Sequence, residues 1–111
     1  MKNLFDETLN ALNYNGKNIE DIISIQGDDF SISLGNFIEV AQSTNYDSGY
    51  GSQYVAKDLK IIGNGWWLER REYDGSEWWE FCTVPQLITE KRNVKYLACN
   101  RYGYSSLKEL N

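Results

Sequence analysis

Two turn signals constrain the fold of this chain most strongly, and they are Asn64-Gly65 and Asp74-Gly75. Both dipeptides are typical of the two central positions of a type I′ turn, which connects adjacent antiparallel strands. Two such signals within one short segment predict a three-stranded antiparallel meander inside residues 57–84.

The register of the meander follows from counting outward from each turn as a two-residue loop. In the first hairpin this count places Lys60 opposite Glu69 and Asp58 opposite Arg71, and such opposite-charge pairs across strands are favourable. The register that the first turn predicts therefore agrees with the charges. The second hairpin is predicted to pair Tyr73 with Ser76, Glu72 with Glu77, Arg71 with Trp78, Arg70 with Trp79, Glu69 with Glu80, Leu68 with Phe81 and Trp67 with Cys82.

Consecutive residues of a strand point to opposite faces, so the register divides the meander into an apolar and a polar face. Trp67 and Trp78 fall on the polar face, where they are expected to form an aromatic patch. The apolar face, expected to lie under helices, carries Leu59, Ile61, Trp66, Leu68, Trp79 and Phe81. The polar face, expected to meet water, carries Asp58, Lys60, Glu69, Arg71, Tyr73 and Glu80.

One charged residue is on the wrong face, and two others form an unfavourable pair across the strands. Arg70 falls on the apolar face, where a guanidinium needs an acidic partner or a stacking contact with Trp79. Glu72 and Glu77 are like charges directly opposed beside the second turn. We expect this glutamate pair to lie at an exposed end of the meander.

Periodicity predicts two helices and a further hairpin before the meander. Apolar residues recur at helical spacing over residues 2–13, which predicts an amphipathic helix. Alternating apolar and polar residues on both sides of Gly27-Asp28-Asp29 predict a β-hairpin. Residues 34–43 favour a short second helix with Asn36 as a cap.

The signal is weaker after the meander. Residues 89–98 can form a helix, and residues 94–99 can instead form another strand. The start Glu90-Lys91-Arg92 disfavours a strand and so favours the helix. Ser105 or Ser106 can cap a final helical turn.

Composition restricts the chemistry. The chain lacks His, the usual general base near neutral pH and the commonest zinc ligand. Its 11 Lys and Arg against 16 Asp and Glu give a net charge of −5, which argues against direct binding of nucleic acid. Cys82 and Cys99 form no CxxC motif and are expected to be free thiols.

Residues 1–111 are therefore expected to form a single α+β domain: N-terminal helix, β-hairpin, short helix, three-stranded antiparallel meander and C-terminal helix. No secretory signal and no apolar run of membrane-spanning length is recognisable, so we expect a cytoplasmic protein without membrane contact. We expect no enzymatic activity, no metal and no cofactor.

The segment from residue 45 to residue 53 is predicted to be a loop that contains Tyr46 and Tyr50. Tyrosines in such a loop can contact a partner, because their rings give contact area at small entropic cost. They can also pack back onto the sheet and anchor the loop.

Several motifs give the chain a family resemblance. They are YDSGYG at 46–51, WWLER at 66–70 and EYDGSEWWEF at 72–81, with weaker agreement at LFDETL near the start. In these motifs the chain resembles a family of small acidic proteins encoded by prophages and other mobile elements of Gram-positive bacteria. The resemblance implies a cytoplasmic accessory protein of a phage or integrative element, and it transfers no site residues.

Two hypotheses of function follow. In the first, the protein binds a host or phage protein through an acidic, aromatic surface, and inhibits a host defence or nucleic-acid-processing complex. In the second, it is a structural or assembly module that forms a homodimer through the face of Trp67 and Trp78. A C-terminal helix that covers this face as a second core layer is the third arrangement we consider. The predicted partner-binding residues are Tyr46, Tyr50, Trp67, Glu69, Arg71, Tyr73, Trp78 and Glu80.

Overall fold

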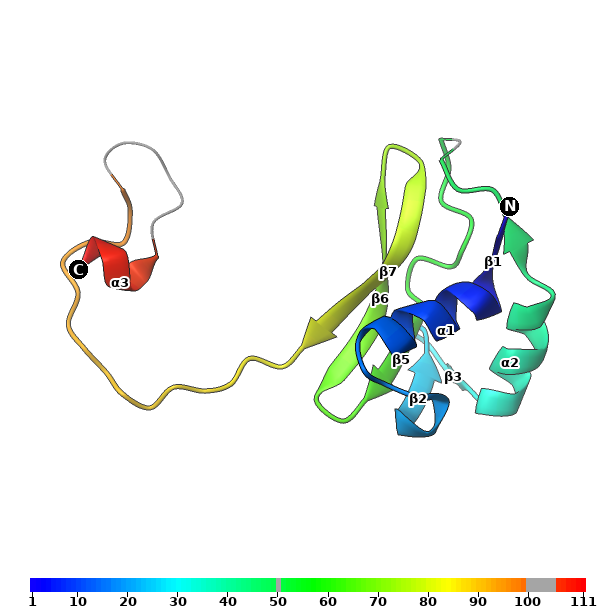
Figure 1. Ribbon diagram of the computed structural model, residues 1–111, viewed down its shortest axis with the longest axis horizontal. Coiled ribbons are helices and arrows are strands. Elements are labelled where there is room, and N and C mark those ends of the chain that lie inside the picture. Colours follow the sequence, from blue (N-terminus) through cyan, green and yellow to red (C-terminus); the bar gives the residue numbers. More distant parts are fainter. Residues whose placement is uncertain (50, 100–105) are drawn as a thin grey trace.

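The computed structural model, which describes residues 1–49, 51–99 and 106–111, is built around a five-stranded antiparallel sheet. The strand order in this sheet is β3-β2-β5-β6-β7, and a separate two-stranded ladder pairs β1 with β4 (Figure 1). The predicted α+β class is confirmed. The elements are β1 (Lys2–Asn3), α1 (Leu4–Tyr14), the 3₁₀ helix η1 (Ile19–Asp21), β2 (Ile22–Gln26), β3 (Ser31–Ile32), α2 (Leu34–Gln42), β4 (Asn45–Tyr46), β5 (Lys60–Gly63), β6 (Trp66–Tyr73), β7 (Ser76–Thr83) and α3 (Leu107–Leu110).

The meander of β5, β6 and β7 has the predicted register in both hairpins. β5 pairs with β6 from Lys60 opposite Glu69 to Gly63 opposite Trp66. In β6 and β7, all the predicted pairs from Trp67 opposite Cys82 to Tyr73 opposite Ser76 are present. Turn chemistry alone was therefore sufficient to set which side chains share a face of the meander.

The two turns differ in conformation. Asp74 and Gly75 have φ values of 51° and 85°, as a type I′ turn requires. At the other turn Gly65 has a φ of 82° but Asn64 does not have a positive φ, so the prediction of a type I′ turn is wrong there. The strands are still joined through two residues, which is why the register is unaffected.

The first hairpin is shorter than predicted. β5 begins at Lys60, so Asp58 does not pair with Arg71. The carboxylate of Asp58 instead accepts the backbone N–H of Asp28 at 2.9 Å, and the Arg71 guanidinium lies 3.7 Å from Glu69. The residues just before β5 therefore contact the β2–β3 turn and are not part of the β5–β6 ladder.

The predicted hairpin and the meander form one sheet, because β2 pairs with β5. Ile25 lies opposite Ile61 in this pairing and opposite Ile32 in the β2–β3 hairpin. The register shifts between Ile22 and Ser24, which marks a bulge in β2. The sheet therefore places β3 at one edge and β7 at the other.

Both N-terminal helices start at side-chain caps. Asn3 accepts the backbone N–H of Asp6 at the start of α1. Ser33 accepts the backbone N–H of Asn36 at the start of α2, so the cap is Ser33 and the prediction of Asn36 is wrong. Because Asn36 lies three residues after the serine, it supplies the N–H and not the capping oxygen.

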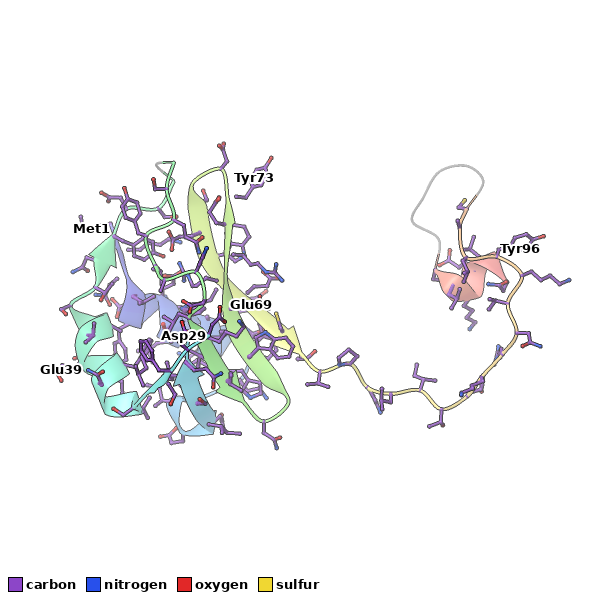
Figure 2. All side chains as sticks on the ribbon, turned by 180° about the vertical axis from the view of Figure 1, so that it is seen from behind. Met1, Asp29, Glu39, Glu69, Tyr73 and Tyr96 are labelled. Carbon is purple, nitrogen blue, oxygen red and sulfur yellow. The ribbon has the colours of Figure 1, made fainter. Side chains whose placement is uncertain are left out.

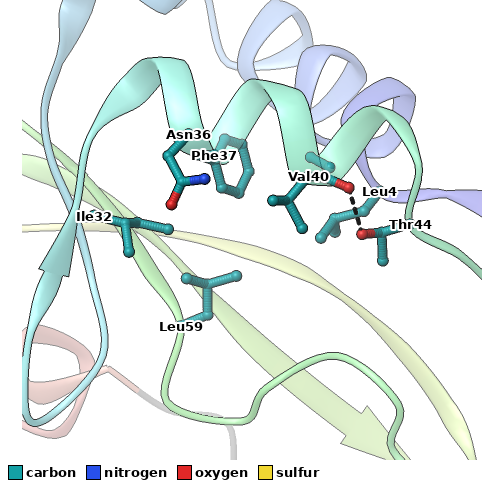
Figure 3. A pocket seen from close by; sticks show the side chains of 8 residues that line it. Leu4, Ile32, Asn36, Phe37, Val40, Thr44 and Leu59 are labelled. Atoms are coloured by element: carbon teal, nitrogen blue, oxygen red, sulfur yellow. Dashed lines mark hydrogen bonds between the residues drawn. The ribbon is translucent and has the colours of Figure 1, made fainter.

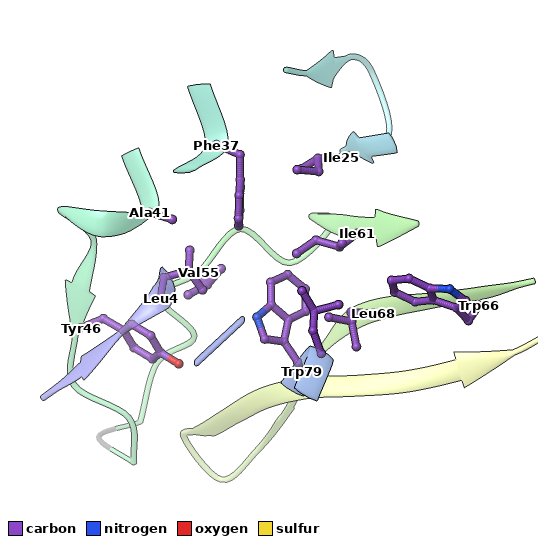
Figure 4. Packing of buried hydrophobic residues seen from close by; sticks show 11 residues of the cluster. Leu4, Ile25, Phe37, Ala41, Tyr46, Val55, Ile61, Trp66, Leu68 and Trp79 are labelled. Carbon is purple, nitrogen blue, oxygen red and sulfur yellow. The ribbon is translucent and has the colours of Figure 1, made fainter. Parts of the chain in front are cut away.

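The core lies between the helices and the sheet face that carries Ile61, Leu68 and Trp79, as predicted (Figure 4). Trp79 is fixed there, since its indole N–H donates to Thr8 of α1 at 3.0 Å. The buried apolar residues are Leu4, Leu12, Ile25, Phe37, Ala41, Tyr46, Val55, Ile61, Trp66, Leu68 and Trp79.

The chain after β7 leaves the sheet (Figure 1). Residues 84–99 have no helix or strand, so both the predicted helix over 89–98 and its alternative, a strand over 94–99, are wrong. The final turn is helical, and α3 is capped by Ser106, one of the two predicted residues. Both cysteines are free thiols, as predicted.

Candidate functional site

The candidate site is the face of β5, β6 and β7 that points away from the helices, which we call the outer face. Trp67 and Trp78 lie on it, as the register predicts. Its residues are Lys60, Ile62, Trp67, Glu69, Arg71, Tyr73, Trp78, Glu80 and Cys82. Figure 2 shows Glu69 within the sheet and Tyr73 at the end of the β6–β7 hairpin.

Each outer-face indole is bound to a glutamate two residues along its own strand. The N–H of Trp67 donates to Glu69 at 2.8 Å, and the N–H of Trp78 donates to Glu80 at 2.9 Å. Residues two apart in a strand share a face, so a Trp-x-Glu sequence permits this contact. A hydrogen bond within its own strand therefore orients each ring.

The two Trp-x-Glu units run in opposite directions across the β6–β7 pair. Glu69 lies opposite Glu80, while Trp67 lies opposite Cys82 and Trp78 lies opposite Arg71. The two carboxylates consequently lie in the middle of the face, with one indole on each side along a diagonal. This is an aromatic surface with a charged centre.

Glu69 is the most heavily bonded residue of the outer face. The Trp67 indole and then the Cys82 thiol, which donates at 3.1 Å, lower the pKa of the Glu69 carboxyl. Conversely, partial burial and the bond to Glu69 raise the pKa of the Cys82 thiol. Glu69 is thus held ionised and Cys82 protonated near neutral pH.

The outer face is open in the described part of the chain. Trp78 is 37% exposed and Tyr73 is 78% exposed, while Trp67 is half-buried. The segment after β7 runs away from the sheet, so the C-terminal helix predicted as a possible cover is not on this face (Figure 1). The side chains of Arg71 and Glu80 are also exposed.

Tyr46 does not belong to this surface. It is buried at 6% exposure, and its hydroxyl donates to Glu7 at 2.5 Å and accepts from Arg70 at 3.1 Å. This burial corrects the assignment of Tyr46 to a binding surface, because the ring anchors the start of the loop. Tyr50, the other predicted loop tyrosine, lies outside the described residues.

A buried charge network behind the outer face holds the loop on the edge of the sheet. The Arg70 guanidinium binds Glu77 at 2.7 Å and Glu7 at 3.1 Å, and it stacks over the Trp79 ring at 4.8 Å. The two partner types predicted for Arg70, an acid and Trp79, are therefore both present. Burial by itself would lower the pKa of Arg70, but the bonds to Glu77 and Tyr46 raise it overall.

The prediction that Glu77 lies at an exposed end of the meander is wrong. Glu77 is 1% exposed, and its carboxylate also accepts the backbone N–H groups of Tyr54 at 2.6 Å and Val55 at 3.1 Å. Its own N–H donates to Ser48. The signal was available, because Glu77 lies two residues before Trp79 and therefore shares the core face with Trp79 and Arg70.

Residues 1–49, 51–99 and 106–111 contain no group of three or more His, Cys, Asp or Glu side chains arranged to hold a metal ion. Within the same ranges, no helix combines the length and apolarity needed to cross a bilayer.

Comparison of the chain with protein families, with curated proteins and with solved structures found no match.

Proposed function

We propose that the protein is a non-enzymatic binding module, an accessory protein of a phage or mobile element, whose outer face docks on a host or phage protein. The observation that carries this proposal is the pair of indoles on an open sheet face, each fixed by a hydrogen bond to a glutamate. The free thiols agree with action in the cytoplasm.

The physical basis is the usual anatomy of a protein interface. Tryptophan, tyrosine and arginine dominate the residues whose removal costs most binding energy, and the outer face has Trp67, Trp78, Tyr73 and Arg71. Rings that are already fixed lose less entropy when a partner orders them. The charged residues around the indoles supply the polar rim that sets orientation.

A narrower form of the proposal is inhibition of a nucleic-acid-processing complex. A net charge of −5 favours approach to a basic groove, where carboxylates can take the place of phosphates. Within the outer face, however, Lys60 and Arg71 balance Glu69 and Glu80. Binding that weakens steeply as salt rises supports this mimicry, and binding that is indifferent to salt rejects it while leaving the aromatic contact in place.

Affinity capture with matched variants tests the proposal. Immobilised wild-type protein is compared with Trp78→Ala, which alters the outer face, and with Tyr14→Ala, which removes a 91% exposed ring on α1. We expect a partner from an extract of the bacterial host to bind the wild type and Tyr14→Ala and to be lost with Trp78→Ala. A partner that binds all three equally contradicts the proposal.

Self-association through the same face is the second candidate. The open aromatic surface suits a symmetric contact between two copies as well as a contact with another protein. Sedimentation velocity at micromolar concentration separates the two, because Trp78→Ala converts an outer-face dimer into a folded monomer. A wild-type monomer rejects self-association and leaves the first proposal standing.

A further inference from the structure

The charge of this chain is divided between two parts of the fold. We call residues 1–83 the body and residues 84–111 the arm, because β7 ends at Thr83. The body contains 6 Lys and Arg against 14 Asp and Glu, a net charge of −8, while the arm contains 5 against 2, a net charge of +3. An acidic body and a basic arm attract each other.

The arm also exposes apolar side chains. Leu87 is 88% exposed, Ile88 is 84% exposed and Leu97 is 80% exposed. Large apolar residues gathered on one segment without cover mark an interaction surface. The arm therefore has both the charge and the apolar groups of a ligand for the body.

The body offers a matching groove beside α2 and β3. It consists of two hollows of about 180 and 200 Å³, which adjoin because Ile32 and Leu59 line both. Figure 3 shows the apolar walls of the first hollow, where Phe37 and Val40 of α2 face Leu59. These two hollows are of a size to accept aliphatic side chains.

The second hollow adds negative charge and a further aromatic wall. Asp29 and Asp58 line it, together with Phe30, which is 74% exposed. The Asp28 backbone N–H lowers the pKa of the Asp58 carboxyl, which keeps this rim ionised near neutral pH. The groove is thus apolar along its walls and carries two carboxylates at one end, where Lys57 and Lys60 lie near Asp58.

We propose that the arm of one copy docks in the α2–β3 groove of a second copy, so that two chains exchange arms. Leu87 enters the first hollow and Lys91 reaches the acidic rim. In an extended chain these two side chains point to the same side, and Lys91 follows Leu87 by roughly 13 Å, which is enough to span from that hollow to the rim.

The topology favours a second copy over the arm's own body. The arm leaves from β7, at one edge of the sheet, whereas the groove adjoins β3 at the other edge. Four strand spacings, about 19 Å, separate these edges. The arm runs away from its own body (Figure 1), and a reciprocal exchange about a twofold axis fills both grooves.

Sedimentation velocity on two full-length variants tests the exchange. One variant is altered only in the arm, and the other only in the groove of the body. The arm variant is Leu87→Ser with Ile88→Ser, and the groove variant is Phe30→Ser with Val40→Lys; all four side chains are more than half exposed. We expect a wild-type dimer whose dissociation constant rises at least about tenfold in either variant. Raising salt from about 0.05 M to about 0.5 M weakens the wild-type dimer as well.

Mixing the two variants gives the sharpest result. The arm variant keeps an unaltered groove, and the groove variant keeps an unaltered arm. We therefore expect that neither variant dimerises alone, and that an equimolar mixture forms a heterodimer with one intact arm-to-groove contact. A wild type that is monomeric at all accessible concentrations overturns the proposal, as does a dimer that persists in both variants. Loss of the dimer in Trp78→Ala instead assigns the contact to the outer face and also overturns the exchange.

Discussion

The Arg70 guanidinium lies 2.7 Å from the Glu77 carboxylate, and neither side chain has any exposed surface. A buried ion pair is more stable when more of its remaining donors and acceptors are satisfied. Glu7 and Tyr46 accept N–H groups of the two terminal Arg70 nitrogens, and two loop amides bind Glu77, while the buried Nε of Arg70 has no hydrogen-bond partner. One network therefore joins α1, the meander and the loop that precedes β5.

Removing Glu77 is expected to be far more damaging than removing the glutamate opposite it. Glu77→Ala leaves the charge of Arg70 and two loop amides without their acceptor, and we expect a loss of about 3–5 kcal/mol in the free energy of unfolding. Glu72→Ala, across the ladder but exposed, should change it by less than about 0.5 kcal/mol. Urea denaturation of the two variants checks this, and equal losses would contradict the role of Glu77.

Replacing Gly63 and Gly35 by alanine should change the free energy of unfolding in opposite directions. A Cβ at Gly63 would lie 2.0 Å from the Trp66 ring, which is buried and stacked on Phe81. We expect Gly63→Ala to cost about 1–3 kcal/mol. A Cβ at Gly35 meets nothing within 4 Å in α2, so Gly35→Ala should stabilise by up to about 1 kcal/mol. Thermal midpoints that move in the same direction for both variants would be inconsistent with these contacts.

Stability should fall at alkaline pH because of Tyr46. Burial, together with the hydrogen bond to Glu7, raises the pKa of Tyr46 from 10.0 to about 12. The Tyr46 hydroxyl loses its proton at a lower pH in the unfolded chain than in the folded protein. The contribution of Tyr46 to the free energy of unfolding is therefore complete below pH 10 and is lost as the pH rises towards 12. Urea midpoints measured across this window should drop less steeply in Tyr46→Phe than in the wild type; parallel slopes would exclude Tyr46 as the source.

The two cysteines should differ in reactivity. The raised pKa of Cys82 and its partial burial leave little thiolate, whereas Cys99 is exposed. In labelling with a disulfide reagent at mildly alkaline pH, we expect Cys99 to react first and Cys82 slowly. Glu69→Gln removes the carboxylate next to Cys82 and should accelerate its reaction in a Cys99→Ser background. An unchanged rate would show that Glu69 does not control this thiol.

The sequence predicted best those features of the fold that depend on residues close together in the chain. Two turn dipeptides set the register of the meander, and the register placed Trp67 and Trp78 on the outer face without further information. It also placed Arg70 among apolar residues, which required a partner. The pairing of β2 with β5 carries no such turn signal, because it joins strands far apart in the chain.

Other features depend on particular contacts between side chains, and knowing which face of the sheet a residue lies on does not reveal these contacts. The hydrogen bonds from each outer indole to its glutamate depend on ring orientation, which alternation along a strand does not fix. The burial of Tyr46 depends on Glu7 in α1 and on Arg70 in β6. After Pro85, apolar residues at helical spacing find no surface to pack on, so spacing alone predicted a helix that does not form.

Quenching of tryptophan fluorescence by acrylamide, a neutral quencher that the carboxylates beside the indoles do not repel, tests most directly whether the outer face is open to a partner. The wild type is compared with Trp67→Phe combined with Trp78→Phe, and with Trp66→Phe as the matched core control. We expect that a red-shifted fraction of wild-type emission is quenched, that this fraction disappears in the outer-face variant, and that it survives in the control. Wild-type emission that acrylamide does not quench would contradict an open outer face, because both outer indoles would then be covered.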